Sequence, residues 1–175
     1  MLFRSGSFSL SITNASTGAT TQNVTATGKA LAVAPSTSAS NISFGTIGAG
    51  KVVLSSWTNG NGSSRIVVAR LTATTRVAPT DGFGYTANSL VFTDGSNPTT
   101  GTGNKVVYNG GNSPITITGL SALNGYSFDI YEQNGSGTSS AYYYTSSATA
   151  STTTVAAAYY WNGGTISTSP AAGGT

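Results

Sequence analysis

The chain is predicted to be an all-β protein built as a two-sheet sandwich. Apolar residues recur at every second position in short runs, and clusters of Gly, Asn, Ser and Thr separate these runs. Such alternation is typical of strands with one buried face, and no stretch has the 3.6-residue apolar stripe of an amphipathic helix. Glu, Lys and Leu, which favour helices, are rare. The sequence therefore predicts antiparallel strands joined by turns.

The first strands are expected to form a hairpin that belongs to a preceding module. Phe8, Leu10 and Ile12 alternate with Ser and Thr, and residues 22–28 are predicted to return beside them. Because two strands alone are marginally stable, we expect them to belong to a sheet whose other strands lie upstream. Residues 1–31, which include VTATGKAL, resemble the last strands of an immunoglobulin-like β repeat. Residues 1–5 do not continue the alternation and are expected to be extraneous to that repeat.

A linker and a complete domain are expected next. Residues 32–40 are rich in Ala, Ser and Thr around Pro35, which is typical of a stiffened linker. The domain is predicted over residues 41–146. Its seven or eight short strands suit a two-sheet sandwich, although their number leaves immunoglobulin-like and jelly-roll connectivities open. The strands are expected near residues 42–47, 52–57, 65–71, 90–92, 105–108, 115–117, 126–131 and 141–145.

After this domain the sequence predicts a second linker and the start of another module. Residues 147–158 are again rich in Ser, Thr and Ala, and they are expected to connect modules. Residues 159–175 are expected to open a further β-rich repeat, with Trp161 in its core. The chain is therefore predicted to be a window onto a longer array of β modules.

Several features of the domain resemble the fibronectin type III family. Trp57 lies near the end of the second expected strand, Leu120 at a corner between strands, and Tyr126 six residues later. The blocks WTNGNGSSRIVVAR, PTDGFGYTAN, GTGNKVVYNG and YEQNGSG resemble a Gly- and Asn-rich bacterial variant of that family, over roughly residues 37–148. Glycine-rich insertions after the third and fourth strands make this domain longer than a plain repeat, and no Arg-Gly-Asp tripeptide is present.

The resemblance implies a structural role for several residues. In such domains the tyrosine hydroxyl bonds to backbone upstream and closes the end of the sandwich, which assigns Tyr126 to structure. Trp57 is expected to be the largest core residue, and its truncation to Ala would cost about 3–5 kcal/mol. The core residues expected on these grounds are Trp57, Leu120, Tyr126, Phe128 and Ile130.

The composition leaves little room for catalysis. The 175 residues include 7 Lys and Arg, 4 Asp and Glu, and no His or Cys. The commonest general base, thiol nucleophiles, disulfides and the usual imidazole or thiolate metal ligands are therefore missing. Asp81 and Asp94 each precede Gly in a loop, which suits turns better than a calcium site. No catalytic residue, cofactor or metal site is expected.

One carboxylate pair and one tyrosine cluster remain as candidates. Asp129 and Glu132 lie three residues apart on a strand and so point to opposite faces, which does not suit a glycosidase. An exposed ion pair of Glu132 with Arg65 is expected instead, contributing at most ~1 kcal/mol. Exposed rings could contact a sugar or a protein, and the candidates for such a surface are Tyr131, Tyr142, Tyr143 and Tyr144. Because alternate residues of a strand face opposite ways, at least one ring of the 142–144 run is expected in the core or between the sheets.

The basic residues and the apolar runs exclude two classes of partner. The net charge of +3 comes from scattered residues, namely Arg4, Lys29, Lys51, Arg65, Arg70, Arg76 and Lys105. Nucleic-acid binding needs clustered cations, so no nucleic-acid partner is expected. No apolar run reaches the ~20 residues of a membrane helix, so no membrane insertion is expected.

The expected function is that of a non-catalytic spacer or adhesion module in a large secreted or cell-surface protein. Its expected partners are neighbouring domains of the same polypeptide, together with a carbohydrate or another surface protein. The alternative is an accessory carbohydrate-binding module of an extracellular polysaccharide-degrading enzyme, which would require two or three coplanar exposed rings.

Overall fold

The computed structural model describes residues 7–13, 23–87, 90–94, 103–142, 147–161 and 166–167. Within these ranges the regular structure is antiparallel strand, and the helical elements are two 3-10 turns, η1 (Phe92–Asp94) and η2 (Gly137–Ser139). The expected all-β class is confirmed.

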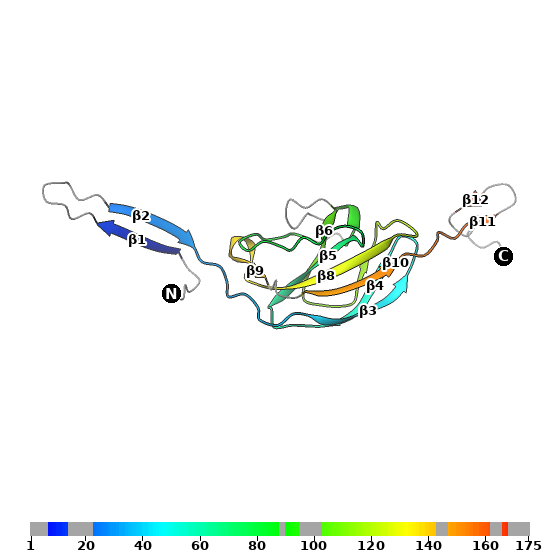
Figure 1. Cartoon of the computed structure of the whole chain (residues 1–175), viewed down its shortest axis with the longest axis horizontal. Coiled ribbons are helices and arrows are strands. Elements are labelled where there is room, and N and C mark those ends of the chain that lie inside the picture. The colour runs from blue at the N-terminus through cyan, green and yellow to red at the C-terminus, as the bar shows by residue number, and fades with distance from the viewer. Residues whose placement is uncertain are drawn as a thin grey trace, which may run out of the picture.

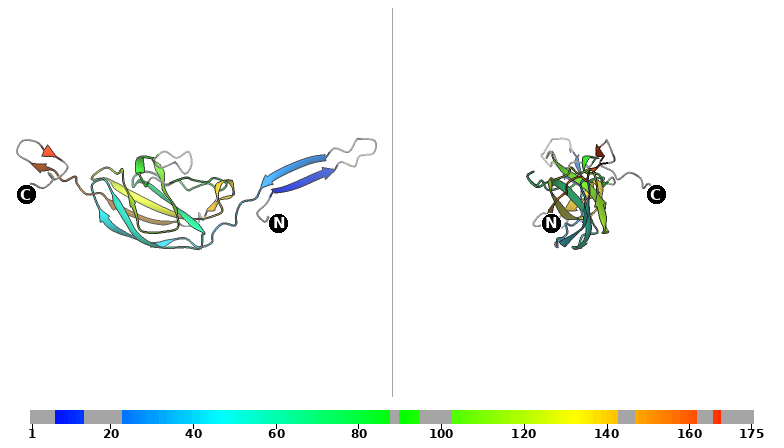
Figure 2. Two further views of the ribbon diagram at one scale, coloured as in Figure 1. Left: turned by 180° about the vertical axis from the view of Figure 1, so that it is seen from behind. Right: turned by 90° about the vertical axis from the view of Figure 1, so that its right-hand side faces the viewer.

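Two antiparallel sheets make up the central body (Figures 1 and 2). One sheet has the order β3 (Ser40–Ile47), β4 (Val52–Thr58), β7 (Ile115–Ile117). The other has the order β10 (Ala148–Thr153), β8 (Gly125–Asn134), β5 (Ser64–Leu71), β6 (Asn104–Gly110), with β9 (Ala141–Tyr142) paired to the end of β8. The central strand β8 pairs with β5 from Ser64 opposite Gln133 to Leu71 opposite Tyr126.

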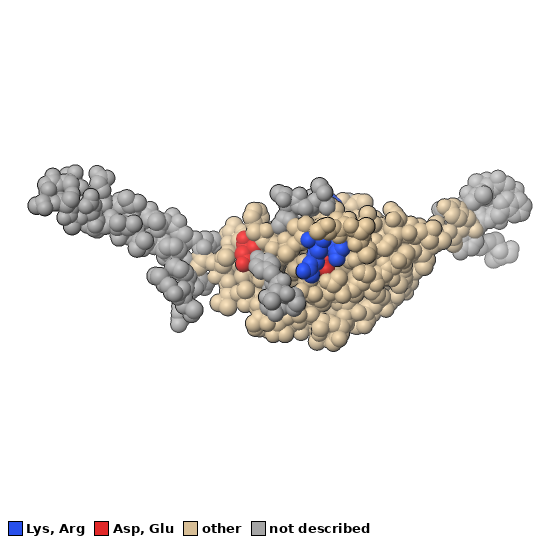
Figure 3. All heavy atoms as spheres, viewed as in Figure 1, with Lys and Arg blue, Asp and Glu red and all other residues tan. Residues whose placement is uncertain are grey.

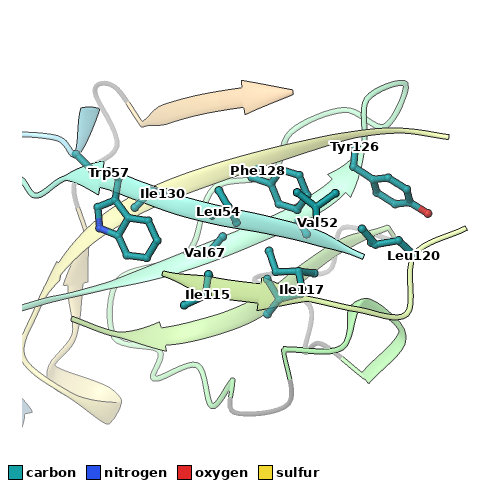
Figure 4. Close-up of a cluster of buried hydrophobic side chains, with 13 residues drawn as sticks. Val52, Leu54, Trp57, Val67, Ile115, Ile117, Leu120, Tyr126, Phe128 and Ile130 are labelled. Atoms are coloured by element: carbon teal, nitrogen blue, oxygen red, sulfur yellow. The ribbon is translucent and has the colours of Figure 1, made fainter. Parts of the chain in front are cut away.

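The main core lies between the two sheets (Figure 4). In Figure 4 the Trp57 indole closes one end of this core, and Tyr126 and Leu120 lie at the other end. The indole N–H of Trp57 donates a hydrogen bond to the Asn59 side-chain oxygen at 2.9 Å, which satisfies its polar edge. The buried members of the core include all five residues expected from the sequence: Ala39, Val52, Leu54, Trp57, Val67, Ala69, Val107, Ile115, Ile117, Leu120, Tyr126, Phe128 and Ile130.

The Tyr126 hydroxyl accepts a hydrogen bond from the backbone N–H of Ser121 at 2.9 Å. This contact ties the start of β8 to the loop that precedes it, as expected from the sequence. Its ring also meets Phe92 edge-on, with the centroids 5.3 Å apart. The residue therefore joins the core to the end of the sandwich.

The strand β10 was not expected, because residues 147–158 were predicted to be a linker. Its six residues pair with β8 from Ala148 opposite Ile130 to Thr153 opposite Gly125. Thr154 then bonds Asn124 through its backbone N–H at 3.0 Å. Small Ala, Ser and Thr side chains suit an edge strand but carry little hydrophobic signal, so the predicted domain boundary at residue 146 falls inside the sheet.

The outer face of the larger sheet is covered by a second apolar cluster. The connection between β5 and β6 folds back over this face and brings Tyr85 and Ala87 onto β5, β6 and β8. As a result β8 is buried on both faces, apart from its ends. The cluster consists of Ile66, Val68, Tyr85, Ala87, Val106, Tyr131 and Tyr142.

Short hairpins lie on either side of the sandwich (Figure 1). β1 (Ser7–Thr13) pairs with β2 (Asn23–Lys29), and β11 (Tyr160–Trp161) pairs with β12 (Ile166–Ser167). The strand expected near residues 90–92 is a single bridge from Val91 to Thr118, followed by η1. Residues 1–5, expected to be extraneous, lie outside the described residues.

Candidate functional site

Arg65 and Glu132 form an ion pair, but the pair is buried rather than exposed. The Arg65 Nε lies 3.0 Å from the Glu132 Oε1, and the two side chains are 4% and 0% exposed. They are opposite each other on β5 and β8, as the antiparallel pairing predicts. The exposure expected from the sequence was wrong because the 59–62 loop folds over the pair.

Glu132 organises that loop. Its Oε1 accepts a hydrogen bond from the Gly60 N–H at 3.0 Å, and its Oε2 accepts one from the Gly62 N–H at 2.9 Å. Gly60 and Gly62 lie so close to the carboxylate and to neighbouring backbone that a Cβ would clash at either position. Arg65 also donates through Nη1 to the carbonyl of Gly111. The pair therefore links two loops and two strands at one end of the sandwich.

A second ion pair lies on the outer face of the same sheet. The Arg70 Nε is 2.9 Å from the Asp129 Oδ2, and Asp129 is fully buried. Asp129 also accepts a 2.6 Å hydrogen bond from the Thr149 hydroxyl on β10, while Arg70 donates to the Thr74 carbonyl at 2.8 Å. Both carboxylates of β8, Asp129 and Glu132, are thus engaged in pairs with arginine.

Asp129 and Glu132 have separate sets of partners. Asp129 bonds Arg70 and Thr149, whereas Glu132 bonds Arg65 and the 59–62 loop, so the two share no partner. Alternate side chains of a strand point to opposite faces, which accounts for this separation. In the described part of the chain, no group of three or more Asp, Glu, His or Cys residues could hold a metal ion.

Two of the four tyrosines proposed as a contact surface are buried. Tyr131 and Tyr142 are each 1% exposed and belong to the second apolar cluster, and Tyr142 donates its hydroxyl hydrogen to the Phe83 carbonyl at 2.8 Å. Their assignment to the surface was wrong because the β5–β6 connection covers a face that alternation would leave to solvent. Tyr143 and Tyr144 lie outside the described residues.

Burial also changes the acidity of these two side chains. Burial raises the pKa of Tyr142 to about 12, and it raises the pKa of Tyr131 above 10, with the Asp129 carboxylate adding to the effect. Both hydroxyls therefore stay protonated at neutral pH. The rings fill space, and their hydroxyls are not poised as nucleophiles.

A feature that the sequence analysis missed is a group of exposed apolar side chains at one end of the sandwich. Phe83 is 61% exposed, and its ring stacks on Tyr85 with the centroids 6.5 Å apart. Leu31 and Val33 are also exposed, and Leu31 approaches Gly82, the neighbour of Phe83. The available signal was the motif DGFGY, in which glycines flank a phenylalanine in a loop.

We call this end the N-terminal pole; it consists of residues 30–39, 59–62, 81–85 and 134–141. On the face shown in Figure 3, basic and acidic atoms occupy small areas, and most of the described surface carries neither. No described segment is a helix with the length and apolarity needed to cross a membrane.

Comparison with known proteins adds no relative, since no protein-family model, curated protein or solved structure matches the chain.

Proposed function

We propose that the chain supplies a non-catalytic spacer or adhesion module, of fibronectin type III character, to a large secreted or cell-surface protein. The observation that carries this proposal is the placement of the two connections. In Figure 1 the chain joins the sandwich beside β9 and leaves it after β10 at the opposite end. A module connected in this way adds its full length to an array.

The strand order supports the family part of the proposal. With β3 as the first strand, the first, second and fifth strands of the domain form one sheet, and the third, fourth, sixth and last form the other. In the immunoglobulin-like plan, strands A, B and E likewise face strands C, F and G, and β6 would take the place of an added strand beside C. The hydrogen bond between Ser121 and the Tyr126 hydroxyl corresponds to the tyrosine corner of that plan.

Resistance to extension would come from the last strand. β10 pairs with β8 over six consecutive positions and leads directly to the C-terminal connection. Hydrogen bonds of an antiparallel pair lie perpendicular to the strands, so tension along the array would load them in shear together. The carboxylates of Asp129 and Glu132 add cross-links from β8 to β5 on both faces.

The carbohydrate-binding alternative has lost part of its basis. It depended on exposed coplanar rings, and Tyr131 and Tyr142 are buried. The large aromatic rings that are exposed among the described side chains are Phe83 and Tyr159, which lie in the β5–β6 connection and beyond β10. Within the described ranges, no specific contact favours sugar over protein as a partner.

Single-molecule stretching of the full chain between two handle proteins tests the proposal. We expect one dominant unfolding event that releases up to roughly 400 Å of chain, the extended length of residues 39–154 at about 3.5 Å each. Smooth extension without such an event would contradict the spacer role. Binding of the same chain to a glycan array would instead favour the carbohydrate-binding alternative.

A further inference from the structure

The segment between the hairpin and the sandwich is docked along its length. Its residue Ala32 donates a backbone N–H to the Ser139 carbonyl at 2.8 Å. The Asn134 side chain donates to the Val33 carbonyl at 2.9 Å. Pro35 and Ala39 are buried, and so is Ala30 at its start. We call residues 30–37 the strap.

Asn61 fastens the second half of the strap. Its side-chain oxygen accepts hydrogen bonds from the backbone N–H groups of Ser36 and Thr37, each at 2.9 Å. Its amide nitrogen donates to the Ser36 hydroxyl at 2.9 Å. A flexible linker would leave these backbone groups to water. The strap is therefore part of the folded domain.

Glycines allow the close approach of the segments that meet at the N-terminal pole. A Cβ on Gly84 would lie 2.6 Å from the Cα of Gly137, and one on Gly135 would lie 2.5 Å from the Ser139 carbonyl oxygen. A Cβ on Gly60 would clash with the Thr37 carbonyl of the strap. Close packing of backbone segments therefore explains glycines that the sequence analysis treated only as part of loop insertions.

The exposed apolar side chains lie where the strap begins. β2 ends at Lys29, two residues before Leu31. Two residues span at most about 7 Å, so a folded module that contains β2 must end next to Leu31 and Phe83. Large exposed apolar groups at such a place are typical of an interaction surface.

We propose that Leu31, Val33 and Phe83 seat the module to which β1 and β2 belong, and that the strap holds the two modules as one rigid unit. This inference rests on the proposed array function and names the partner of this surface. Interfaces between domains of one chain default to mobility unless they are well packed. Here the segment between the two modules is docked on the sandwich, so no flexible linker is left to allow them to move relative to each other.

Distance measurements between two spin labels test this inference on the full chain. The protein has no Cys, so Lys29→Cys and Thr153→Cys provide the sole labelling sites. A docked strap predicts a narrow distance distribution between them. A free segment of about eight residues would spread its ends over roughly 15 Å, so a broad distribution in the otherwise unchanged chain would overturn the proposal.

Three variants separate the strap, the apolar surface and a general surface effect. Asn61→Ala combined with Asn134→Asp removes the side-chain contacts to the strap, while the introduced carboxylate keeps an oxygen that accepts from the Ser63 N–H. This variant and Phe83→Ser should each broaden the distribution about twofold or more. Leu123→Ser, at an exposed leucine at the opposite end, should leave the width unchanged.

An unchanged width in both pole variants would also overturn the inference, provided that Trp57 fluorescence shows the domain folded. The distance measurements and the stretching experiment can fail independently of each other. A broad distribution combined with a single unfolding event under force would reject the rigid junction and retain the spacer.

Discussion

Replacement of Glu132 by Gln is expected to destabilise the domain far more than loss of a surface ion pair would. The substitution keeps the size and shape of the side chain but removes its charge. Arg65, 4% exposed, then loses its carboxylate partner and remains buried with an uncompensated charge. Breaking a buried pair in this way costs about 3–5 kcal/mol.

The loop adds to this cost. The Gly60 and Gly62 N–H groups both donate to the Glu132 carboxylate, and Gln has one acceptor oxygen where the carboxylate has two. A buried N–H left without a partner costs about 1–3 kcal/mol, and these terms overlap rather than add. We expect a total loss of about 4 kcal/mol, a large part of the 5–15 kcal/mol that is typical of a folded domain.

Urea unfolding followed by Trp57 fluorescence measures this loss, with Trp161→Phe as the background so that one indole reports. With a typical urea dependence near 2 kcal/mol per molar, the midpoint should fall by about 2 M. The double variant Arg65→Met/Glu132→Leu removes both charges and should cost less than the two single changes together, by up to about 3 kcal/mol. A midpoint shift below about 0.5 M for Glu132→Gln would refute the reasoning, because an exposed pair would give that result.

Three further predictions concern other parts of the fold. Tyr142 has a pKa of about 12 in the folded domain and about 10 in the unfolded chain. Its contribution to stability is therefore complete below pH 10 and is lost between about pH 10 and 12. In measurements of the urea midpoint against pH, Tyr142→Phe should make the loss of stability over this range smaller. Leu123 has a φ of 57° and is 71% exposed, so Leu123→Asn should raise the thermal unfolding free energy by about 0.5–1 kcal/mol; a decrease would contradict this account of strain. A chain ended after residue 146 lacks β10 and should give the circular dichroism of an unfolded protein, whereas a chain ended after residue 158 should fold; a folded shorter chain would show that β10 is dispensable.

The period-two pattern predicted most of the sandwich because it reports directly on burial. Phe128 and Ile130 are buried where alternation placed them. Trp57 is also buried, but it is out of phase with Val52 and Leu54 on its strand, and it was expected in the core from the family resemblance. The strand expected near residues 65–71 is β5, which is buried from Arg65 to Ala69. The pairing of Arg65 with Glu132 followed from the antiparallel arrangement of their strands.

What the sequence could not predict depends on segments with no periodic signal. β10 consists of Ala, Thr and Ser, whose small side chains fit equally well in a linker. The β5–β6 connection covers the sheet through Tyr85 and Ala87, and a loop that folds back has no period to reveal it. Tyr131 and Tyr142 were therefore assigned to a surface that this loop covers.

The buried ion pair and the strap belong to one continuous set of contacts. Glu132 holds the N–H groups of Gly60 and Gly62, and Asn61 lies between these two glycines. Asn61 in turn holds the strap at Ser36 and Thr37. Compared with an apolar pair of the same size, a buried ion pair contributes little net stability. We therefore infer that the Arg65–Glu132 pair serves mainly to fix the shape of the 59–62 loop. The buried Arg65–Glu132 pair would then control how firmly the strap is docked on the domain.

This coupling predicts that Glu132→Gln loosens the strap beyond its effect on global stability. In hydrogen exchange, the amides of Ser36 and Thr37 should exchange about tenfold or more faster, through local opening of the strap. The matched control is Ile117→Ala, a fully buried core change in β7 with an expected cost of about 2–5 kcal/mol. It destabilises the domain by a similar amount without touching the 59–62 loop, so under conditions of local opening it should leave these two amides unchanged. Equal acceleration in both variants would mean that the strap opens only when the whole domain unfolds, and the buried pair would then have no separate influence on the junction.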